Sequence, residues 1–280
     1  MGRKLFCEIN PTCYKISVQK EIIKRDLKDF FSGKKIAKSH SKSELPIVVK
    51  GHSSVLIRNL HGVDIELQKN KVTNIQLTCD KINGIIIKPN ETFSFWKTVG
   101  KVNEKQGYKE GLVISVKKGE RSGLTSGVGG GLCQMANMIH WLVLNSPLTV
   151  TELHHHSDAL FPDERRTVPF GTGTSIAYKN VDYRFMNETN CDVQILVWIQ
   201  EGELRGEIRS SEKYPYRYKL VEENNHYRKE GEEYYRISQV YRIVINRETN
   251  EEIAKELILD NHSKVMYDHA LIPKDEIREV

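Results

Sequence analysis

The segment SGVGGGLCQMANMIHWLVLN, residues 126–145, constrains the fold more than any other part of the chain. Its apolar residues surround most of a helix over 133–145, so that helix has to be buried on nearly all sides. Gly129, Gly130 and Gly131 precede it, and glycine permits positive φ angles and a close approach of other groups to the backbone. The segment therefore predicts a buried central helix that begins at a glycine loop.

Helical spacing of apolar residues recurs at 17–31 and 72–82, with Gly33 and Gly84 at the ends of these patterns. Short apolar or alternating stretches predict strands at 45–50, 54–58, 63–68, 85–88, 92–96, 111–117, 149–155, 174–178, 181–187 and 192–199. We therefore expect an α+β fold with a mixed or antiparallel sheet. The expected parts are a basic N-terminal helical segment with a linker (1–44), a central catalytic or binding domain (45–202) and a β-rich C-terminal extension (203–280).

The five cysteines are odd in number, widely spaced and without a CxxC pair, so neither a disulfide framework nor a redox motif is expected. The first residues, MGRKLFCEIN, lack the apolar core of a signal peptide, and position 6 lacks the Ser or Thr of a myristoylation motif. No run approaches the roughly 18 apolar residues that a membrane span needs. The sequence thus predicts a cytoplasmic protein.

Positive charge is concentrated in residues 1–50, which hold 12 Lys and Arg against 5 Asp and Glu in a chain whose net charge is +5. Such an excess indicates either a solvated helix face or attraction to an acidic surface. Aromatic residues are not interleaved with the basic ones as nucleic-acid stacking requires. We therefore expect no nucleic-acid partner, and the alternative to a solvated face is peripheral contact with an anionic membrane.

Cys133 is the candidate nucleophile because it occupies the first turn of the predicted helix, where the helix dipole favours a thiolate and lowers the pKa. Amides of the glycine loop would form an oxyanion hole, with the Gln134 side chain as a further donor. The loop has no GK[ST] sequence after it and is not a P-loop. The alternative is that Cys133 is a small buried apolar residue.

A thiolate nucleophile needs a base. His140 shares a helix face with Cys133 but lies about 10 Å further along the axis, so it is interpreted as a core residue. His154, His155 and His156 follow on an expected strand, where His154 and His156 share one face. The residues alone do not decide which carboxylate would orient the base: Asp158, Asp163 or Asp182.

Further pocket candidates are Ser94, Tyr108 and Ser126, whereas Trp96 and Trp141 are expected in the core. His154 and His156 on one face of a strand, together with Cys133, would also form a set of three zinc ligands. A second cysteine ligand with suitable spacing is missing, however, so we expect no metal and no cofactor.

Three blocks of the chain resemble the VanW-type family: KPNETFSFWKTVG (88–100), GVGGGLCQMANMIHWLVL (127–144) and the stretch from TELHHHSD to VDYRFMNET (151–189). The resemblance covers about 60–199 and implies a link to the bacterial cell envelope. Some members are cysteine-dependent L,D-transpeptidases, which implies Cys133 as nucleophile and His156 as its base. Asp182 and Asn187 match recurrent positions, but 169–175 lack the carboxylate that members often carry there.

These observations give three hypotheses. The first is cysteine-dependent acyl transfer on peptidoglycan-type peptides, resembling an L,D-transpeptidase, with an accessory role in glycopeptide resistance. The second is a non-catalytic module that binds muropeptides or peptidoglycan precursors. The third is a zinc-dependent hydrolase.

Overall fold

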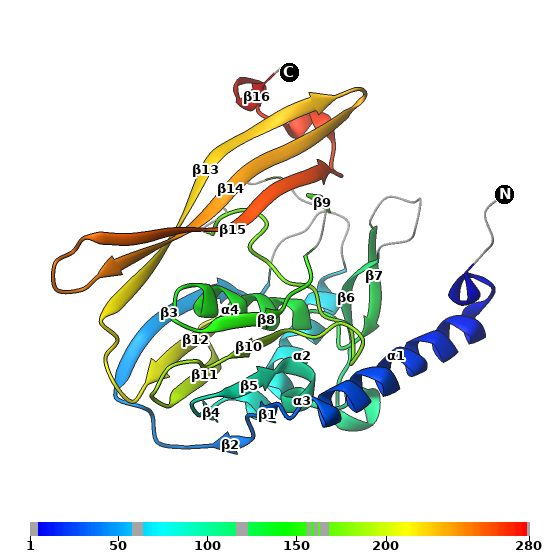
Figure 1. Cartoon of the computed structure of the whole chain (residues 1–280). Coiled ribbons are helices and arrows are strands. Elements are labelled where there is room, and N and C mark those ends of the chain that lie inside the picture. Colours follow the sequence, from blue (N-terminus) through cyan, green and yellow to red (C-terminus); the bar gives the residue numbers. More distant parts are fainter. Residues whose placement is uncertain are drawn as a thin grey trace.

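The computed structural model describes residues 5–57, 64–115, 123–155, 158–159, 162 and 168–278. Helix α4 (Leu132–Leu144) lies at its centre, where the sequence predicts the buried helix (Figure 1). Nine of its 13 residues are buried, because its apolar side chains extend around most of its circumference. Elements from before and after it in the chain, α2 (Ile65–Ile82), β3 (Ile47–Val55) and β12 (Glu203–Ser210), pack around this helix.

Helix α4 packs against a five-stranded antiparallel sheet. The strand order is β2 (Ser39–His40), β4 (Ile85–Ile87), β11 (Val193–Gln200), β12 (Glu203–Ser210) and β3 (Ile47–Val55). Gly206 in β12 lets the helix approach, because a Cβ there would lie 3.1 Å from atoms of Met138 and Leu142. Helix α2 (Ile65–Ile82) contacts both α4 and β11.

A second, mixed sheet has the order β1 (Lys35–Ile36), β5 (Glu91–Ser94), β10 (Arg184–Met186) and β8 (Thr149–Glu152), with β1 parallel to β5. Its buried Phe93 and Phe185 stack with ring centroids 5.0 Å apart. Helix α3 (Phe95–Val99) follows β5 directly. A 3-10 turn (Glu104–Gln106) and the hairpin of β6 (Glu110–Ser115) and β7 (Gly123–Val128) lead into the glycine loop. The predicted α+β class is confirmed.

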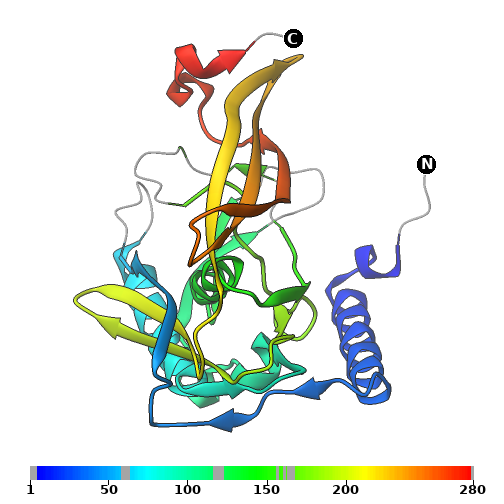
Figure 2. The same cartoon turned by 60° about the vertical axis from the view of Figure 1, so that its left-hand side comes forward.

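The C-terminal part is a long antiparallel sheet of β13 (Tyr216–Glu230), β14 (Glu233–Asn246) and β15 (Glu252–Val265) (Figures 1 and 2). Its edges carry β16 (Ile277–Arg278) and β9 (Asp158–Ala159), and two 3-10 turns (His269–Leu271 and Lys274–Glu276) precede β16. The predicted boundary at residue 202 falls inside the β11–β12 hairpin. Strand β12 belongs to the central sheet, so the C-terminal part begins after Ser210.

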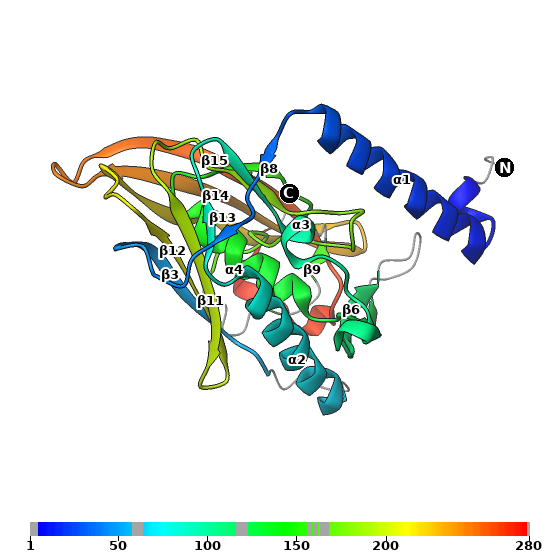
Figure 3. The ribbon, with the colours of Figure 1, turned by 90° about the horizontal axis from the view of Figure 1, so that it is seen from below.

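Helix α1 (Pro11–Phe31) follows a short 3-10 turn (Phe6–Glu8) and extends along one side of the molecule, with its N-terminal half away from the rest (Figures 2 and 3). It begins six residues earlier than the apolar spacing predicts, because Asn10 caps it by accepting a hydrogen bond from the Cys13 amide (2.8 Å). Among the described residues, no helix combines the length and apolar character required to span a bilayer.

Two strand predictions are wrong and a third extends too far, each for a local reason. The stretch 63–68 enters α2, whose N-terminus is capped by Asp64 accepting from the Glu66 amide (2.9 Å). The stretch 174–178 contains an isolated bridge between Ala177 and Val181 instead of a strand. Strand β8 ends at Glu152, before the histidines.

Candidate functional site

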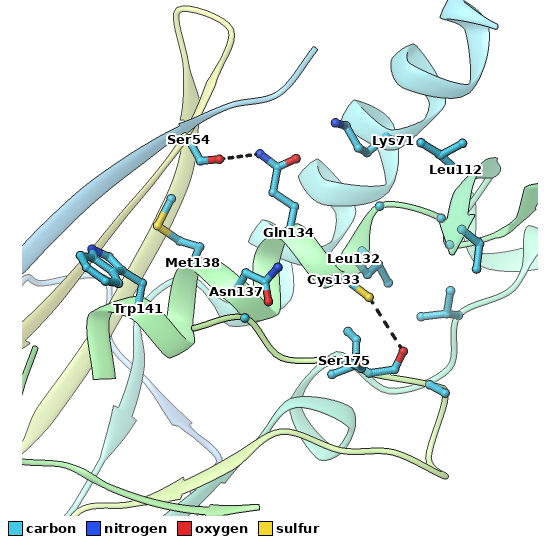
Figure 4. A pocket seen from close by; sticks show the side chains of 18 of the residues that line it. Ser54, Lys71, Leu112, Leu132, Cys133, Gln134, Asn137, Met138, Trp141 and Ser175 are labelled. Atoms are coloured by element: carbon cyan, nitrogen blue, oxygen red, sulfur yellow. Dashed lines mark hydrogen bonds between the residues drawn. The ribbon is translucent and has the colours of Figure 1, made fainter. Parts of the chain in front are cut away.

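A cavity of about 590 Å³ lies beside the N-terminus of α4 (Figure 4). The glycine loop and the first turns of α4 form its floor, and residues of α2 and β3 form two of its walls. The segment 168–178, between β9 and β10, forms much of the remaining wall. The structure thus places the predicted cysteine and glycines together at one cavity.

Cys133 lies in the first turn of α4 and lines this cavity with its side chain partly exposed. Its Sγ is 4.0 Å from the carbonyl oxygen of Ile176 on the facing wall (Figure 4). Burial raises the pKa of the Cys133 thiol, while backbone hydrogen bonds at Ile176 and at Cys133 itself act in the opposite direction. The sequence predicts a lowered pKa, and this is wrong, because desolvation is the larger effect.

The glycine loop positions this turn. Gly129 and Gly131 have φ values of 80° and 95°, which only glycine adopts without strain. Gly131 is the N-cap of α4 and supplies no side-chain hydrogen bond. Within the described part of the chain, the amides of Leu132 and Cys133 have no backbone acceptor, as expected for the first turn of a helix. These amides are the backbone donors that the turn offers to an oxyanion beside Sγ.

The Gln134 side chain is directed away from the sulfur. Its amide nitrogen donates to Ser54 Oγ (2.8 Å) and to the Val55 carbonyl (2.9 Å), both in β3 (Figure 4). The predicted role of Gln134 as an oxyanion donor is therefore corrected. Both of its N–H groups tie α4 to β3, and the backbone amides of the turn are the available donors.

The histidines do not meet Cys133 within the described residues. His154 Nε2 lies 3.0 Å from Glu152 Oε1, and the side chain is not part of the cavity wall. Because β8 ends at Glu152, the strand alternation expected for the histidines does not hold. His156, the predicted base, and Asp163 lie outside the described residues.

His140 is a core residue, as predicted. It is buried, and its Nδ1 lies 3.1 Å from the hydroxyl of Tyr183. Burial lowers the pKa of His140 to about 3, with a smaller contribution from nearby His155. It therefore stays neutral at ordinary pH.

Asp182 and Ser94 belong to a buried structural network rather than to the cavity. The Asp182 carboxylate accepts hydrogen bonds from Ser94 Oγ (2.6 Å), from Arg184 Nε (2.7 Å) and from the amides of Trp96 (3.0 Å) and Tyr183 (2.9 Å). Its predicted role in orienting a histidine is corrected, because these four donors occupy both of its oxygens. The Glu152 carboxylate is bonded to His154, one of the predicted site histidines.

Three other predicted site residues also lie away from the cavity. Tyr108 is buried in the main core, with its hydroxyl 3.4 Å from Thr78 Oγ1. Ser126 is exposed on β7. Asn187 is buried and donates to the carbonyls of Ile87 (2.8 Å) and Cys191 (2.9 Å). Serine, tyrosine and asparagine serve such structural positions often, and one sequence does not distinguish them from ligand contacts.

The polar wall contributed by α2 was not predicted from the sequence. Lys71 and Gln68 line the cavity although both side chains are buried. Within the described residues, Gln68 Oε1 has no hydrogen-bond partner. The signal was present in the helix period, because Gln68 and Lys71 precede Ile75, Cys79 and Ile82 on the buried face. Asn74 and Thr78 on the same face have partners within the protein, whereas Gln68 Oε1 does not and faces the cavity.

The segment 168–178 is also a cavity wall that the sequence did not predict. Asn137 of α4 accepts a hydrogen bond from the Thr174 amide (2.7 Å) on the inner side. On the outer side, the Arg236 guanidinium of β14 lies 4.4 Å from the centroid of the Phe170 ring. The C-terminal sheet therefore supports this wall, although it contributes no residue to the cavity lining.

The three ligands of the zinc hypothesis are also not brought together in the part of the chain that the structure describes. No three His, Cys, Asp or Glu residues there are grouped so that they would hold a metal ion. Cys133 faces Ile176, whereas His154 faces Glu152. The described residues therefore give no support to the zinc hypothesis.

Comparison with known proteins identifies the family. The profile described as VanW like protein matches residues 70–209. Over 237 residues, the chain is 30% identical to the vancomycin B-type resistance protein VanW of Enterococcus faecalis, which covers 85% of this chain and 84% of that protein. This chain belongs to the VanW family. It is also 32% identical over 130 residues to the uncharacterized protein YoaR of Bacillus subtilis, which covers 45% of this chain and 39% of YoaR. No solved structure matches the chain significantly.

The VanW match confirms the resemblance seen in the sequence and locates it on the structure. It begins inside α2, includes the glycine loop, Cys133 and the wall 168–178, and ends in β12. The match thus ends one residue before the end of β12, a strand of the central sheet. Helix α1 and strands β13, β14, β15 and β16 lie outside it.

Proposed function

We propose that this chain acts on peptidoglycan-type peptides or their precursors, and that Cys133 is the nucleophile of an acyl transfer. One observation carries the proposal: Sγ of Cys133 faces a cavity large enough for part of a peptide, beside two helix amides that have no backbone acceptor among the described residues. Amides placed in this way stabilise the oxyanion of an attacked carbonyl.

The proposed reaction begins when the Cys133 thiolate attacks the amide carbonyl of a donor peptide, and His156 takes up the thiol proton. The Leu132 and Cys133 amides hold the oxyanion. The C–N bond then breaks, the leaving amine takes the proton from His156, and a thioester remains on Cys133. Attack by an acceptor amine releases the thiol and forms a new amide. Attack by water releases a carboxylic acid instead.

The walls support a peptide of this kind. Lys71 contributes a cation to the cavity, and stem peptides carry free carboxylates. Gln68 Oε1 offers an acceptor for a peptide N–H. The E. faecalis relative is named a vancomycin B-type resistance protein, and we propose for this chain an accessory role in the same kind of resistance.

The test is turnover of purified tetrapeptide stems with an acceptor amine, with products and protein adducts identified by mass spectrometry. Wild type should form the new amide or the hydrolysed peptide and carry an acyl mass on Cys133. Cys133→Ala should lose at least 100-fold in rate. Cys13→Ala, which removes a thiol of α1 outside the cavity, is the matched control and should keep wild-type turnover. Full activity of Cys133→Ala would disprove the nucleophile.

A second candidate is a non-catalytic module that binds the same peptides. The raised pKa of the Cys133 thiol and the pairing of His154 with Glu152 favour it. Calorimetry separates the two functions. The binding module predicts equal affinity of wild type and Cys133→Ala for the peptide, with no turnover and no adduct in either protein.

A further inference from the structure

Helix α1 carries its apolar stripe on the outside. None of its residues is buried, and its large apolar side chains are mostly exposed, with Phe30 at 80% and Phe31 at 79%. Ile16, Ile23 and Leu27 are also more than half exposed. Ile16, Ile23, Leu27 and Phe30 follow one another at intervals of seven, four and three residues. These intervals place the four side chains on one face of the helix.

Arg25 and Asp29 on the opposite face of α1, and Asp26 on its flank, hold the helix to the protein through charges. Arg25 Nη1 lies 2.7 Å from Glu152 Oε2, and Asp26 Oδ1 lies 2.6 Å from Lys97 Nζ. Asp29 receives two hydrogen bonds from the buried Arg184, at 2.6 and 2.8 Å. Arg25 is about 180° from Ile16 around the helix. The usual amphipathic arrangement is therefore inverted, with ion pairs inside and apolar groups outside.

Positive charge borders the stripe. Lys20, Lys24 and Lys28 are spaced four residues apart and form a row along one side of it. The acidic residues Asp26 and Asp29 are ion-paired to the rest of the protein, and interactions with lysine and arginine keep the pKa of each carboxyl below its usual value. The third acidic residue, Glu21, is exposed, with its Oε2 3.9 Å from Lys24 Nζ. The exposed part of the helix, with four lysines against this one carboxylate, is therefore apolar and net cationic.

We propose that α1 is an in-plane anchor for an anionic lipid membrane. The stripe of Ile16, Ile23, Leu27 and Phe30 enters the boundary between headgroups and acyl chains, while the lysine row contacts the anionic headgroups. An anionic bilayer provides the apolar phase and the negative charge together, which is the complement of this face. Leu5, Phe6 and Ile9, exposed in the turn before α1, extend the apolar surface.

The ion pairs give the anchor a defined direction relative to the domain. Arg25 is bonded to Glu152 in β8, and Asp29 is bonded to Arg184 in β10. Both strands belong to the mixed sheet, and the predicted site histidines follow β8 in the chain. A membrane-bound α1 therefore holds the mixed sheet next to the lipid surface. The inference is independent of whether Cys133 is catalytic.

Co-sedimentation of the full chain with vesicles tests the proposal. Wild type should bind vesicles of phosphatidylcholine with phosphatidylglycerol, bind pure phosphatidylcholine at least tenfold more weakly, and lose binding as salt is raised. The double variant Ile23→Ser with Phe30→Ser should bind anionic vesicles at least tenfold more weakly. So should the triple variant Lys20→Gln, Lys24→Gln and Lys28→Gln.

The matched control replaces two apolar residues of β15 that are similarly exposed, Ile253 at 53% and Leu257 at 54%, by serine. Its vesicle binding should equal that of wild type. Binding of the double variant equal to that of wild type would overturn the proposal, as would wild type remaining in the supernatant with anionic vesicles. A lipid-free dimer that the double variant abolishes would also overturn it, because a second copy would then cover the stripe.

Discussion

Replacing Gly130 by alanine tests whether the glycine loop is held by close backbone packing. Gly130 is the one glycine of the run without a positive φ, so its role is spatial. A Cβ at this position would lie 2.1 Å from the carbonyl carbon and 2.2 Å from the carbonyl oxygen of Gly111 in β6. These are backbone atoms, so the loop and β6 have to move apart.

The cost follows from the contacts that this movement breaks. The Asn74 side chain donates to the Gly130 carbonyl (2.9 Å), and the Gly129 amide donates to the Lys109 carbonyl (3.0 Å). Two lost hydrogen bonds cost about 1 kcal/mol each, and overpacking costs about 1–3 kcal/mol. The Gly130→Ala variant should therefore lose about 3–5 kcal/mol, a large part of the about 5–15 kcal/mol that stabilises a typical protein.

Urea unfolding followed by tryptophan fluorescence measures this loss. Gly202→Ala is the matched control, because Gly202 has a φ of 77° but nothing within 4 Å of its added Cβ. Left-handed backbone strain alone should cost it about 1–2 kcal/mol. A loss in Gly130→Ala no larger than that in Gly202→Ala would refute the packing argument and show that the loop yields at little cost.

Three further predictions concern charge. Burial raises the pKa of the Cys133 thiol above its ordinary 9.0, so its alkylation rate with iodoacetamide should still rise at pH 9, and a plateau below pH 8 would contradict this. Arg184→Met leaves Asp182 and Asp29 without their shared cation. It should cost about 3–5 kcal/mol in urea unfolding, and a loss below about 1 kcal/mol would count against a buried network. The folded pKa of Asp29 is lowered from 3.8 mainly by Arg184, against burial. Its stabilisation is therefore complete above pH 3.8 and is lost as pH falls through the lowered value, so Asp29→Asn should weaken the acid dependence of unfolding, measured at a series of pH values.

Much of the fold was predictable because local patterns agree with the final packing. The apolar circumference of α4 predicted its central position, and the helical spacing before Gly84 predicted most of α2. The strands β4, β5, β6 and β11 were also located from short apolar runs. The stretch 63–68 failed because the Asp64 cap, a single side-chain hydrogen bond, outweighed a strand-like pattern.

The candidate site was predicted less completely. Cys133 and the glycines were identified because their chemistry depends on adjacent positions in the chain. Asp182 and Asn187 were assigned to the site, yet each satisfies hydrogen bonds in a different part of the core. Polar residue types do not reveal whether their partner is a ligand or another part of the protein.

The sequence by itself thus determined a buried helix, a glycine loop and a thiol where they meet, since all three follow from neighbouring residues. The tertiary structure decided what surrounds that thiol. Lys71 and Ile176 reach the cavity from positions far away in the chain, and the C-terminal sheet supports its wall. The tertiary structure also decided that the pKa of Cys133 is raised. Burial causes this shift, and the thiol is buried by segments that are distant in the chain, which no local pattern contains.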